Sequence, residues 1–205
     1  MIKFKDTFFP YFKDFCIEKF GADKGMQLFE KSELKLNELI GENDDRNDKY
    51  IRWHLDKNML PVISIYLMLK EFDIITENAL RYTDEIMQIS RLKMKKKNEF
   101  FGKLPFAYRL FRMFSRRVVS KQYPDAGWNI EWITNDANEV HFDMKSCIYV
   151  EITHKYNCSE LCHLFCANDD VTLSGFQPAI IFKREKTIAR GQGKCDFHFF
   201  NSKIV

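Results

Sequence analysis

Residues 123–144 read YPDAGWNIEWITNDANEVHFDM, and the character of the sequence changes within them. After the turn-forming residues 123–127, apolar and polar residues alternate on either side of the polar segment Asn135–Asn138. Such alternation is typical of half-buried β-strands, and the polar segment suits a hairpin turn. The apolar residues of the pattern are Trp128, Ile130, Trp132, Val140, Phe142 and Met144. We therefore expect a β-hairpin at this position.

The chain before this hairpin has the pattern of helices. Apolar residues from Phe8 to Phe20 recur at the three-and-four spacing of one helix face, and Gly21 stands where such a helix would end. The polar residues 41–48 predict a loop. The other predicted helices cover residues 23–40, 60–72, 76–97 and 104–121.

Helix and strand patterns are mixed after the hairpin. Residues 146–150 predict a strand, and residues 158–166 follow the helical period with Asn157 as a candidate N-cap. Two further strands are predicted at 178–182 and 195–200, on either side of a turn with two glycines. The fold class that follows is α+β.

We expect a helical N-terminal layer, residues 1–121, packed on a small, mostly antiparallel sheet built by residues 122–205. One helix is inserted between the strands, and the two regions share one core. A chain of 205 residues can bury such a core, and 45% hydrophobic with 30% charged residues excludes intrinsic disorder. The 20 Phe against 8 Gly and 5 Pro argue against an all-β chain of many hairpins.

We expect no membrane span and no signal peptide. The longest apolar run, Met59–Leu69, is interrupted by Pro61 and Ser64 and falls short of the ~20 residues that a spanning helix needs. The first residues lack an uninterrupted apolar stretch and a small-residue cleavage site. We expect a cytoplasmic protein, and we therefore expect its six cysteines to be free thiols.

Positive charge is concentrated between residues 91 and 121. The chain carries +3 overall, but this segment holds eleven Lys or Arg against one acid, Glu99, so the rest of the chain carries −7. Phenylalanines are interleaved with the basic residues, a pattern that can serve nucleic acid or anionic lipid. Because no recognised nucleic-acid motif is present, we favour two helices with basic outer faces against acidic neighbours, and no specific nucleic-acid partner.

Chemically active side chains gather in residues 147–198. This segment holds five of the six cysteines, three histidines, the pair Asp169-Asp170 and two arginines. Three interpretations compete: a metal site, a nucleophilic thiol and a binding site for a small acid.

The first interpretation is metal binding. Cys158, Cys162 and Cys166 would form a stripe of about 12 Å along one helix, which is too long for one ion to bind all three. Two of them with Cys195 or His198 could still make a site. Because no Cys-x-x-Cys pair occurs, we assign no metal ligand and expect inert, buried thiols.

The second interpretation is a nucleophilic thiol, which needs a thiolate stabilised by cations or by a helix N-terminus. Cys166 falls at the end of its predicted helix, where the helix dipole disfavours a thiolate. Cys147 and Cys195, both on predicted strands, are better candidates, and Arg184 could face Cys195 across a hairpin. The alternative for each is an apolar core thiol.

The third interpretation is recognition of a small acid. Arg184 and Thr187 flank a turn, and a guanidinium with a hydroxyl can clamp a carboxylate. Arg184 can equally pair with Asp169 or Asp170 and hold its hairpin to the preceding loop. The residues themselves leave both roles open.

The same region contains an ordered set of short motifs. They are Cys147-Ile148-Tyr149, Glu160-Leu161 ahead of Phe165-Cys166-x-x-Asp169, Phe182-x-Arg184, Thr187-Ile188-Ala189-x-Gly191 and Cys195-Asp196-Phe197-x-Phe199. As an ordered set over residues 120–200, they resemble the L-2-amino-thiazoline-4-carboxylic acid hydrolase family. Cys158 and Cys162 are extra relative to that pattern.

The resemblance implies hydrolytic opening of the ring of 2-amino-thiazoline-4-carboxylate to give a carbamoyl-cysteine. The candidate catalytic residues are Cys147, Cys195, Asp169 and Asp196, and the candidate substrate-binding residues are Arg184, Thr187 and Cys166. In the mechanism we expect, Arg184 binds the substrate carboxylate. A cysteine thiolate, or a water held by Asp169, attacks the carbon between nitrogen and sulfur, and Asp196 or His198 protonates the leaving atom. A divalent metal that activates water is the alternative.

Two functions of other classes stand beside this enzyme. The closing Cys-x-Phe strand looks like the small-molecule-binding domains related to the vinyl reductase domain, which implies a sensor or binding module without an activated nucleophile. That module would have a large apolar cavity walled by the phenylalanine-rich helices. The third hypothesis assigns the basic segment 91–121 to anionic lipid or RNA. A small-molecule substrate is the expected partner, and the oligomeric state is not predicted.

Overall fold

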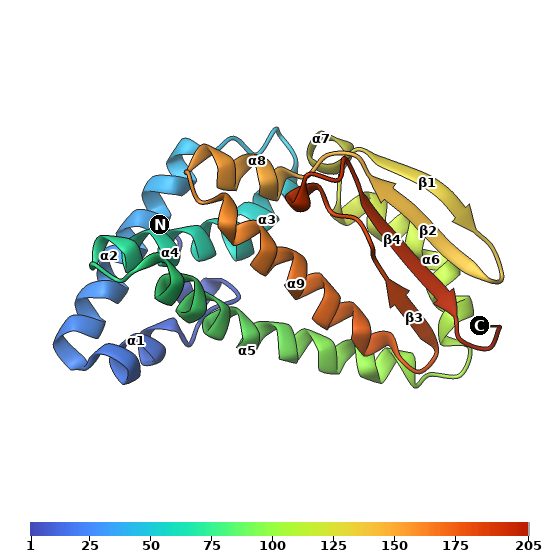
Figure 1. The fold of residues 1–205 in the computed structure, drawn as a ribbon, viewed down its shortest axis with the longest axis horizontal. Helices are drawn as coiled ribbons and strands as arrows, with labels where there is room; N and C mark the ends of the chain where they lie inside the picture. The colour runs from blue at the N-terminus through green and yellow to red at the C-terminus, as the bar shows by residue number, and fades with distance from the viewer. Residues whose placement is uncertain (205) are drawn as a thin grey trace. The chain divides into compact units, whose positions relative to one another are not determined.

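The computed structural model describes residues 1–204 and confirms the predicted α+β class (Figure 1). The chain forms two compact units, Met1–Ser90 and Arg91–Val205. The long helices end near residue 121 as predicted, whereas the compact units divide between Ser90 and Arg91. A single core shared by residues 1–121 and 122–205 stays a prediction.

The first unit is built of helices. Its elements are η1 (Phe4–Asp6), α1 (Phe12–Phe20), α2 (Ala22–Glu42), α3 (Lys49–His54), the π-helical turn η2 (Leu55–Met59), α4 (Leu60–Glu71) and the first part of α5 (Thr76–Gly102). Helices α1, α2, α4 and α5 lie where the apolar spacing predicts them, and Gly21 ends α1. The short helix α3 was not predicted. It is stabilised by its N-cap, Asp48, whose side chain accepts the backbone N–H of Tyr50 at 2.7 Å and of Ile51 at 3.2 Å.

Helix α4 supplies much of the core of this unit. Its residues from Leu60 to Tyr66 are all buried. Pro61 is accommodated in the first turn, where a helix needs no backbone N–H from it. Within residues 1–204, no helix is both long enough and apolar enough to cross a membrane.

Helices α1 and α2 are in close contact at a glycine of α2. A Cβ atom at Gly25 would overlap the backbone carbonyl of Cys16 in α1, whereas Gly41, near the end of the same helix, has open space around it. Helix α2 therefore contains one glycine that close packing requires and one that it does not.

The second unit holds the sheet. Its elements are the last part of α5, α6 (Ala107–Gln122), α7 (Asp125–Trp128), β1 (Ile130–Asn135), β2 (Glu139–Met144), α8 (Ile148–Lys155), η3 (Ser159–Leu161), α9 (Cys162–Leu173), η4 (Ser174–Phe176), β3 (Ile180–Lys183), η5 (Ile188–Arg190) and β4 (Cys195–Asn201). The predicted hairpin is β1 and β2, and the two later strands are β3 and β4.

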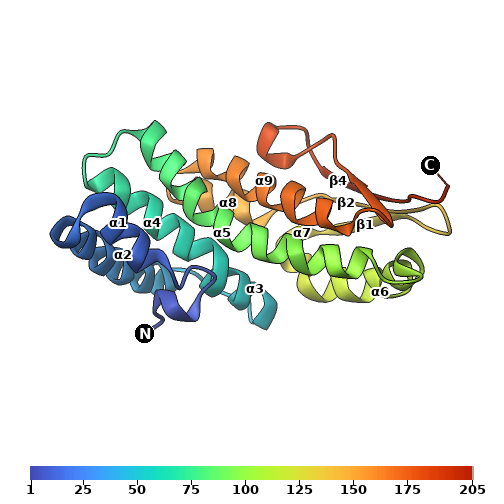
Figure 2. The ribbon, with the colours of Figure 1, turned by 90° about the horizontal axis from the view of Figure 1, so that it is seen from below.

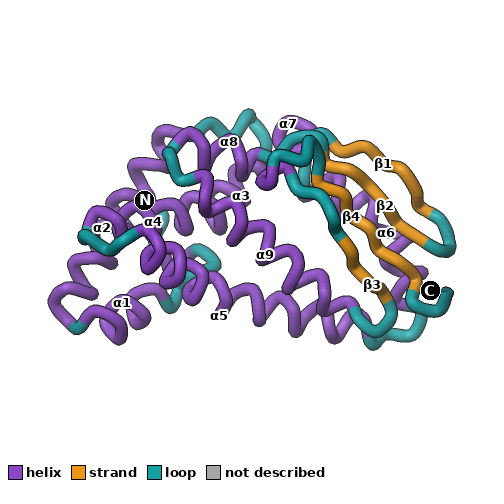
Figure 3. The backbone as a smooth tube through the Cα atoms, in the orientation of Figure 1, coloured by secondary structure: helices purple, strands orange, loops and turns teal. Residues whose placement is uncertain are grey.

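The sheet is antiparallel throughout, with the strand order β1-β2-β4-β3 (Figure 3). Helices α8 and α9 both lie in the chain between β2 and β3, so two helices are inserted where one was predicted. Strand β2 pairs with β4, and the sheet therefore joins segments that are far apart in the sequence.

The sheet has an apolar face and a polar face. Strand alternation places Phe142, Phe197 and Phe199 on one side, where the ring centroid of Phe111 in α6 lies 4.8 Å from that of Phe199. The rings of Phe142 and Phe197 stack at 5.2 Å. The opposite side carries charged and histidine side chains, beginning with Glu139. Helix α6, from the predicted helical part of the chain, therefore covers the apolar face.

The end of α9 lies against the last part of α5 in both views (Figures 1 and 2). The Asn98 side-chain amide donates to the Thr172 carbonyl at 2.8 Å. Gly175, just after α9, comes so close to α5 that a Cβ there would overlap the Lys95 carbonyl. This backbone contact fixes the helix that carries most of the candidate site.

Two element boundaries after the hairpin differ from prediction. Residues 148–150 belong to helix α8 and not to a strand, because Ile148 and Ile152 bury one side of a helix at i and i+4. Helix α9 begins at Cys162 and ends at Leu173, later than predicted at both ends. Asn157 does not cap it: Asn157 has a positive φ of 50° and follows the end of α8.

We expect Gly25→Ala to lower the free energy of unfolding and Gly41→Ala to raise it. The first substitution forces α1 and α2 apart, at a cost of about 1–3 kcal/mol, as for overpacked cores. The second gains ~0.5–1 kcal/mol of helix propensity without a clash. Urea unfolding followed by circular dichroism measures both changes, and equal effects of the two substitutions would contradict the close approach of the helices.

Candidate functional site

The side chain of Arg184, just after β3, is buried and bound to helix α9. Its Nη1 donates to Asp169 Oδ2 at 3.2 Å, and its Nη2 donates to Asp170 Oδ1 at 2.6 Å and to the Cys166 carbonyl at 2.8 Å. Only 3% of the side chain is exposed, and the guanidinium lies over the ring of Phe197, 5.2 Å from its centroid. Arg184 therefore makes the predicted acidic pairs, although its partners lie in a helix and not in a loop.

Asp169 has an unusual proton affinity. Burial, helped by the charge of Asp170, raises the pKa of Asp169 to about 6, and the neighbouring Arg184 only partly opposes this effect. The Asp169 side chain is still 39% exposed, so water reaches the carboxyl. A carboxyl with a pKa near neutrality can both take and give a proton under physiological conditions.

Three thiols from separate elements lie near one another at the same place. Cys147 is the N-cap of α8, Cys166 lies in the second turn of α9, and Cys195 begins β4. A negative charge on Cys195 would raise the pKa of both other thiols, and Arg184 is close enough to lower those of Cys166 and Cys195. The structure thus brings Cys166 and Cys195 close to the guanidinium, with Cys147 near the other two thiols.

All three thiols are protonated at neutral pH. Burial raises the pKa of Cys147 and of Cys166 to about 12 and also raises that of Cys195. The backbone N–H of Ile188 donates to Cys195 Sγ at 3.2 Å and opposes the shift, but burial dominates. Because the thiolate is the nucleophilic form, none of the three is an activated nucleophile.

The surroundings of two thiols differ from prediction. Cys147 precedes a helix and does not lie on a strand, and the amides of Val150 and Tyr149 lower its pKa less than burial raises it. Cys166 lies inside α9, so the predicted position at a helix C-terminus was wrong. Burial is what disfavours its thiolate.

Cys158 and Cys162 join α8 to the start of α9. Cys158 Sγ donates to the Thr153 carbonyl at 3.4 Å, and Cys162 Sγ lies 2.8 Å from Thr153 Oγ1. The 3-10 turn η3 separates Cys158 from α9, so Cys158 does not belong to the predicted stripe, whereas Cys162 and Cys166 lie one turn apart on α9. Both are buried packing thiols, and all six cysteines are free as expected.

A pocket of about 150 Å³ opens beside Arg184. The residues that line it are His163, Cys166, Ala167, Asp170, Arg184, Thr187 and Arg190. Thr187 is buried, and its Oγ1 has no hydrogen-bond partner. Such a hydroxyl is costly to bury unless a ligand binds it. His163 and Arg190 were not predicted as site residues, since no motif pointed to them.

Asp196 and His198 point away from the thiols. Alternation along β4 places both side chains on the face opposite that of Cys195. Asp196 Oδ1 accepts the backbone N–H groups of Glu185 at 3.0 Å and Lys186 at 2.6 Å, and so holds the loop that follows β3. Neither residue lines the pocket, and neither do the predicted catalytic residues Cys147, Cys195 and Asp169. Asp169 is bonded to Arg184 in the pocket wall, whereas Asp196 and His198 lie on the opposite face of the sheet, so the geometry gives no support to their expected role as the acid.

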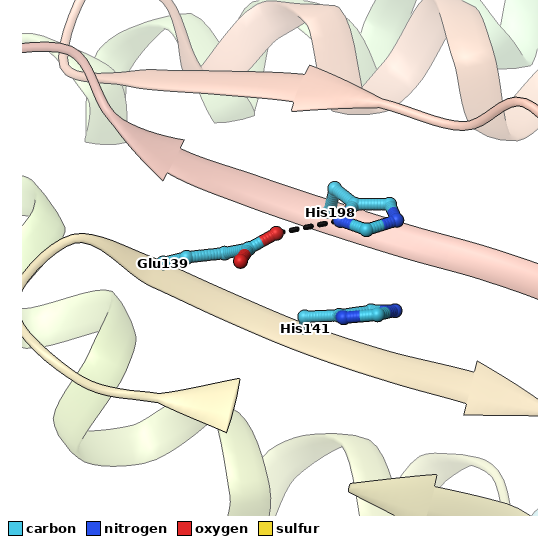
Figure 4. Close-up of side chains that lie close together, drawn as sticks. All are labelled: Glu139, His141 and His198. Atoms are coloured by element: carbon cyan, nitrogen blue, oxygen red, sulfur yellow. Dashed lines mark hydrogen bonds and ion pairs between the residues drawn. The ribbon is translucent and has the colours of Figure 1, made fainter. Parts of the chain in front are cut away.

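Glu139, His141 and His198 form a separate cluster on the polar face of the sheet (Figure 4). One ligand atom from each lies within 4.8 Å of the others. Within residues 1–204 this is the only group of three possible metal ligands, and it contains none of the cysteines. The sequence signal was present in the predicted strand, where Glu139, His141 and Asp143 share one face.

A protein-family model of L-2-amino-thiazoline-4-carboxylic acid hydrolase matches residues 66–199. The chain belongs to this family. The match includes every motif that carried the resemblance, and it extends from the sheet into the helical part of the chain. No curated protein and no solved structure matches the chain.

We expect Cys147, Cys166 and Cys195 to react slowly with an alkylating reagent while the protein is folded. Their labelling rates should keep rising with pH beyond ~8.5, where an ordinary cysteine titrates. Mass spectrometry assigns the labelled residues, and the same protein in urea serves as the control. A thiol of this group that titrates below ~8.5 would show that an activated nucleophile exists.

Proposed function

We propose that this protein is a hydrolase that opens the ring of a small cyclic amidine carrying a carboxylate, such as 2-amino-thiazoline-4-carboxylate, with water as the nucleophile. Family membership supports the reaction class. The observation that carries the choice of nucleophile is Asp169, which is 39% exposed and lies next to the pocket, bonded to Arg184 in its wall. Its pKa of about 6 suits a base, whereas the neighbouring thiols hold their protons.

Water adds to the ring carbon that lies between nitrogen and sulfur, and the carbon–sulfur bond then breaks. The ring carbon becomes the carbonyl of a carbamoyl group. Of the two protons of the water, one ends on an amidine nitrogen and the other on the sulfur, which leaves as a thiol. Asp169 accepts a proton from the attacking water and gives it up as the ring opens, which is the work that a pKa near neutrality suits.

The pocket is suited to a small anion. Arg184 and Arg190 supply two guanidinium groups, and the Thr187 hydroxyl supplies a hydrogen bond that no protein group uses. Its volume of about 150 Å³ lies well below the ~300–1,000 Å³ of sites for drug-sized ligands. Because Asp169 and Asp170 already hold the Nη atoms of Arg184, this arginine also fixes the position of the base.

A second candidate function is binding without catalysis. The protonated thiols favour it, since a sensor needs no nucleophile. The large apolar cavity that this function predicts is not matched by the small pocket with its two arginines, histidine and aspartate. We therefore favour the hydrolase, with Arg184, Thr187 and Cys166 at the substrate and Asp169 as the proton acceptor.

We expect Asp169→Asn to lower kcat by about 10²–10⁴-fold, the usual effect of losing a general base. Asp170→Asn is the comparison, because it also removes an Arg184 partner but leaves the base in place. It should retain most of kcat and move the pH profile to lower pH, since the charge of Asp170 helps to raise the pKa of Asp169. The wild-type kcat/KM should fall as the pH drops through about 6, since the base must be ionised. Thiol release from 2-amino-thiazoline-4-carboxylate measures the rate. Full activity of Asp169→Asn, or no ring opening by the wild type, would contradict the proposal.

We expect Thr187→Val to raise KM by about 3–10-fold with little change in kcat, because one hydrogen bond to the substrate is lost. The same substitution should not lower the free energy of unfolding, since the buried hydroxyl has no partner to lose. The control is Thr83→Val, which removes a buried hydroxyl that donates to the Ala79 carbonyl at 2.8 Å. That variant should be less stable with an unchanged KM. An unchanged KM in Thr187→Val would show that the hydroxyl does not bind the substrate.

A further inference from the structure

Two histidines and a glutamate meet on the polar face of the sheet, away from the pocket (Figure 4). Glu139 and His141 are two residues apart on β2, so their side chains leave the strand on the same side. His198 on β4 stands directly opposite His141 in the register of the pair. The backbone of two hydrogen-bonded strands thus fixes where all three side chains begin.

The side chains of this cluster converge. His198 Nδ1 lies 2.5 Å from Glu139 Oε1, and the two imidazole rings stack with their centroids 3.8 Å apart. All three side chains are partly buried, with 14% of His141, 24% of His198 and 22% of Glu139 exposed. They are therefore sheltered from bulk water but remain reachable from it.

A carboxylate stands behind each imidazole. His141 Nε2 lies within hydrogen-bond distance of Asp143 Oδ1, at 3.3 Å. His198 Nε2 lies 3.8 Å from Asp196 Oδ2, which is close enough for an ion pair but too long for a hydrogen bond. Histidines that bind metals commonly donate their other ring N–H to a carboxylate, which orients the ring and makes it a stronger ligand. If His141 Nε2 donates in this way, its Nδ1 is left to bind an ion. Without an ion, His198 Nδ1 donates its proton to the Glu139 carboxylate, so a metal ion would take the place of this proton between the two groups.

We infer that Glu139, His141 and His198 bind a divalent transition-metal ion such as Zn²⁺. Imidazole nitrogen with a carboxylate oxygen suits zinc, cobalt, nickel and copper, whereas magnesium and calcium prefer oxygen ligands. Metal–ligand bonds of about 2.0–2.2 Å place tetrahedral ligand atoms roughly 3.4 Å apart. The present spacing, within 4.8 Å, needs only small side-chain rotations to reach that value.

The ion ties β2 to β4 and leaves one coordination position open to water or to another ligand. It lies on the face of the sheet opposite Cys195 and the pocket, so it is a site separate from the proposed ring opening. The inference does not depend on the proposed function, because none of its three residues lines the pocket.

Titration of the metal-free protein with Co²⁺ tests the site. We expect one equivalent to bind with visible d–d bands and without the near-ultraviolet charge-transfer band of a thiolate ligand. Zn²⁺ should displace the cobalt and raise the melting temperature. Glu139→Gln, His141→Asn and His198→Asn should each weaken binding by at least the ~10–100-fold that loss of an outer carboxylate costs a metal site.

His154→Asn is the matched control, because it removes an exposed histidine on α8 and should bind like the wild type. Circular dichroism establishes that each variant is folded before it is titrated. Absence of stoichiometric binding by the folded wild type overturns the inference. A thiolate band in the cobalt spectrum, or unchanged binding in all three variants, also overturns it, since the cysteines would then be the ligands.

Discussion

The buried guanidinium of Arg184 holds the candidate site together. Lysine could not replace this arginine, because the guanidinium donates to two carboxylates and a backbone carbonyl of α9 at the same time. Its flat face also packs on the ring of Phe197. Without Arg184, the consecutive carboxylates of Asp169 and Asp170 would lose the cation that they share. Asp169 and Asp170 are 39% and 52% exposed, so water would offset part of this loss. The same contacts fix the wall of the pocket and the proton affinity of Asp169.

The two faces of the antiparallel sheet carry different kinds of side chain. Its apolar face, built of phenylalanines from β2 and β4, packs on α6 and leads to the thiols and Arg184 at the start of β4. Its other face carries carboxylates and histidines that a core could not tolerate. One strand, β4, supplies residues to both sides, and the two-residue period of the strand keeps them apart.

The sequence predicts the elements whose signal is periodic and local. Helices α1, α2, α4, α5 and α6, the β1–β2 hairpin and strands β3 and β4 follow from apolar spacing and turn residues. Helix α8 was missed because its β-branched residues favour a strand locally, while burial of Ile148 and Ile152 favours a helix. The resemblance predicted that Cys147, Cys166 and Cys195 lie together with Arg184 around one pocket, and of these residues Cys166 and Arg184 line it. Burial, which decides the pKa values of the thiols, depends on packing and cannot be read from spacing.

The high proton affinity of Asp169 links the stability of the protein to its acidity. The carboxyl has a pKa of about 6 when folded against an ordinary value of 3.8, so the folded chain holds this proton more tightly than the unfolded one. By linkage, that stabilisation is complete below about pH 3.8 and is lost as the pH rises through about 6. A general base must be ionised to accept a proton, so Asp169 works as the carboxylate, which is the form that destabilises the folded state. At this position, ionisation of the carboxyl would then increase the rate of the reaction and decrease the free energy of unfolding.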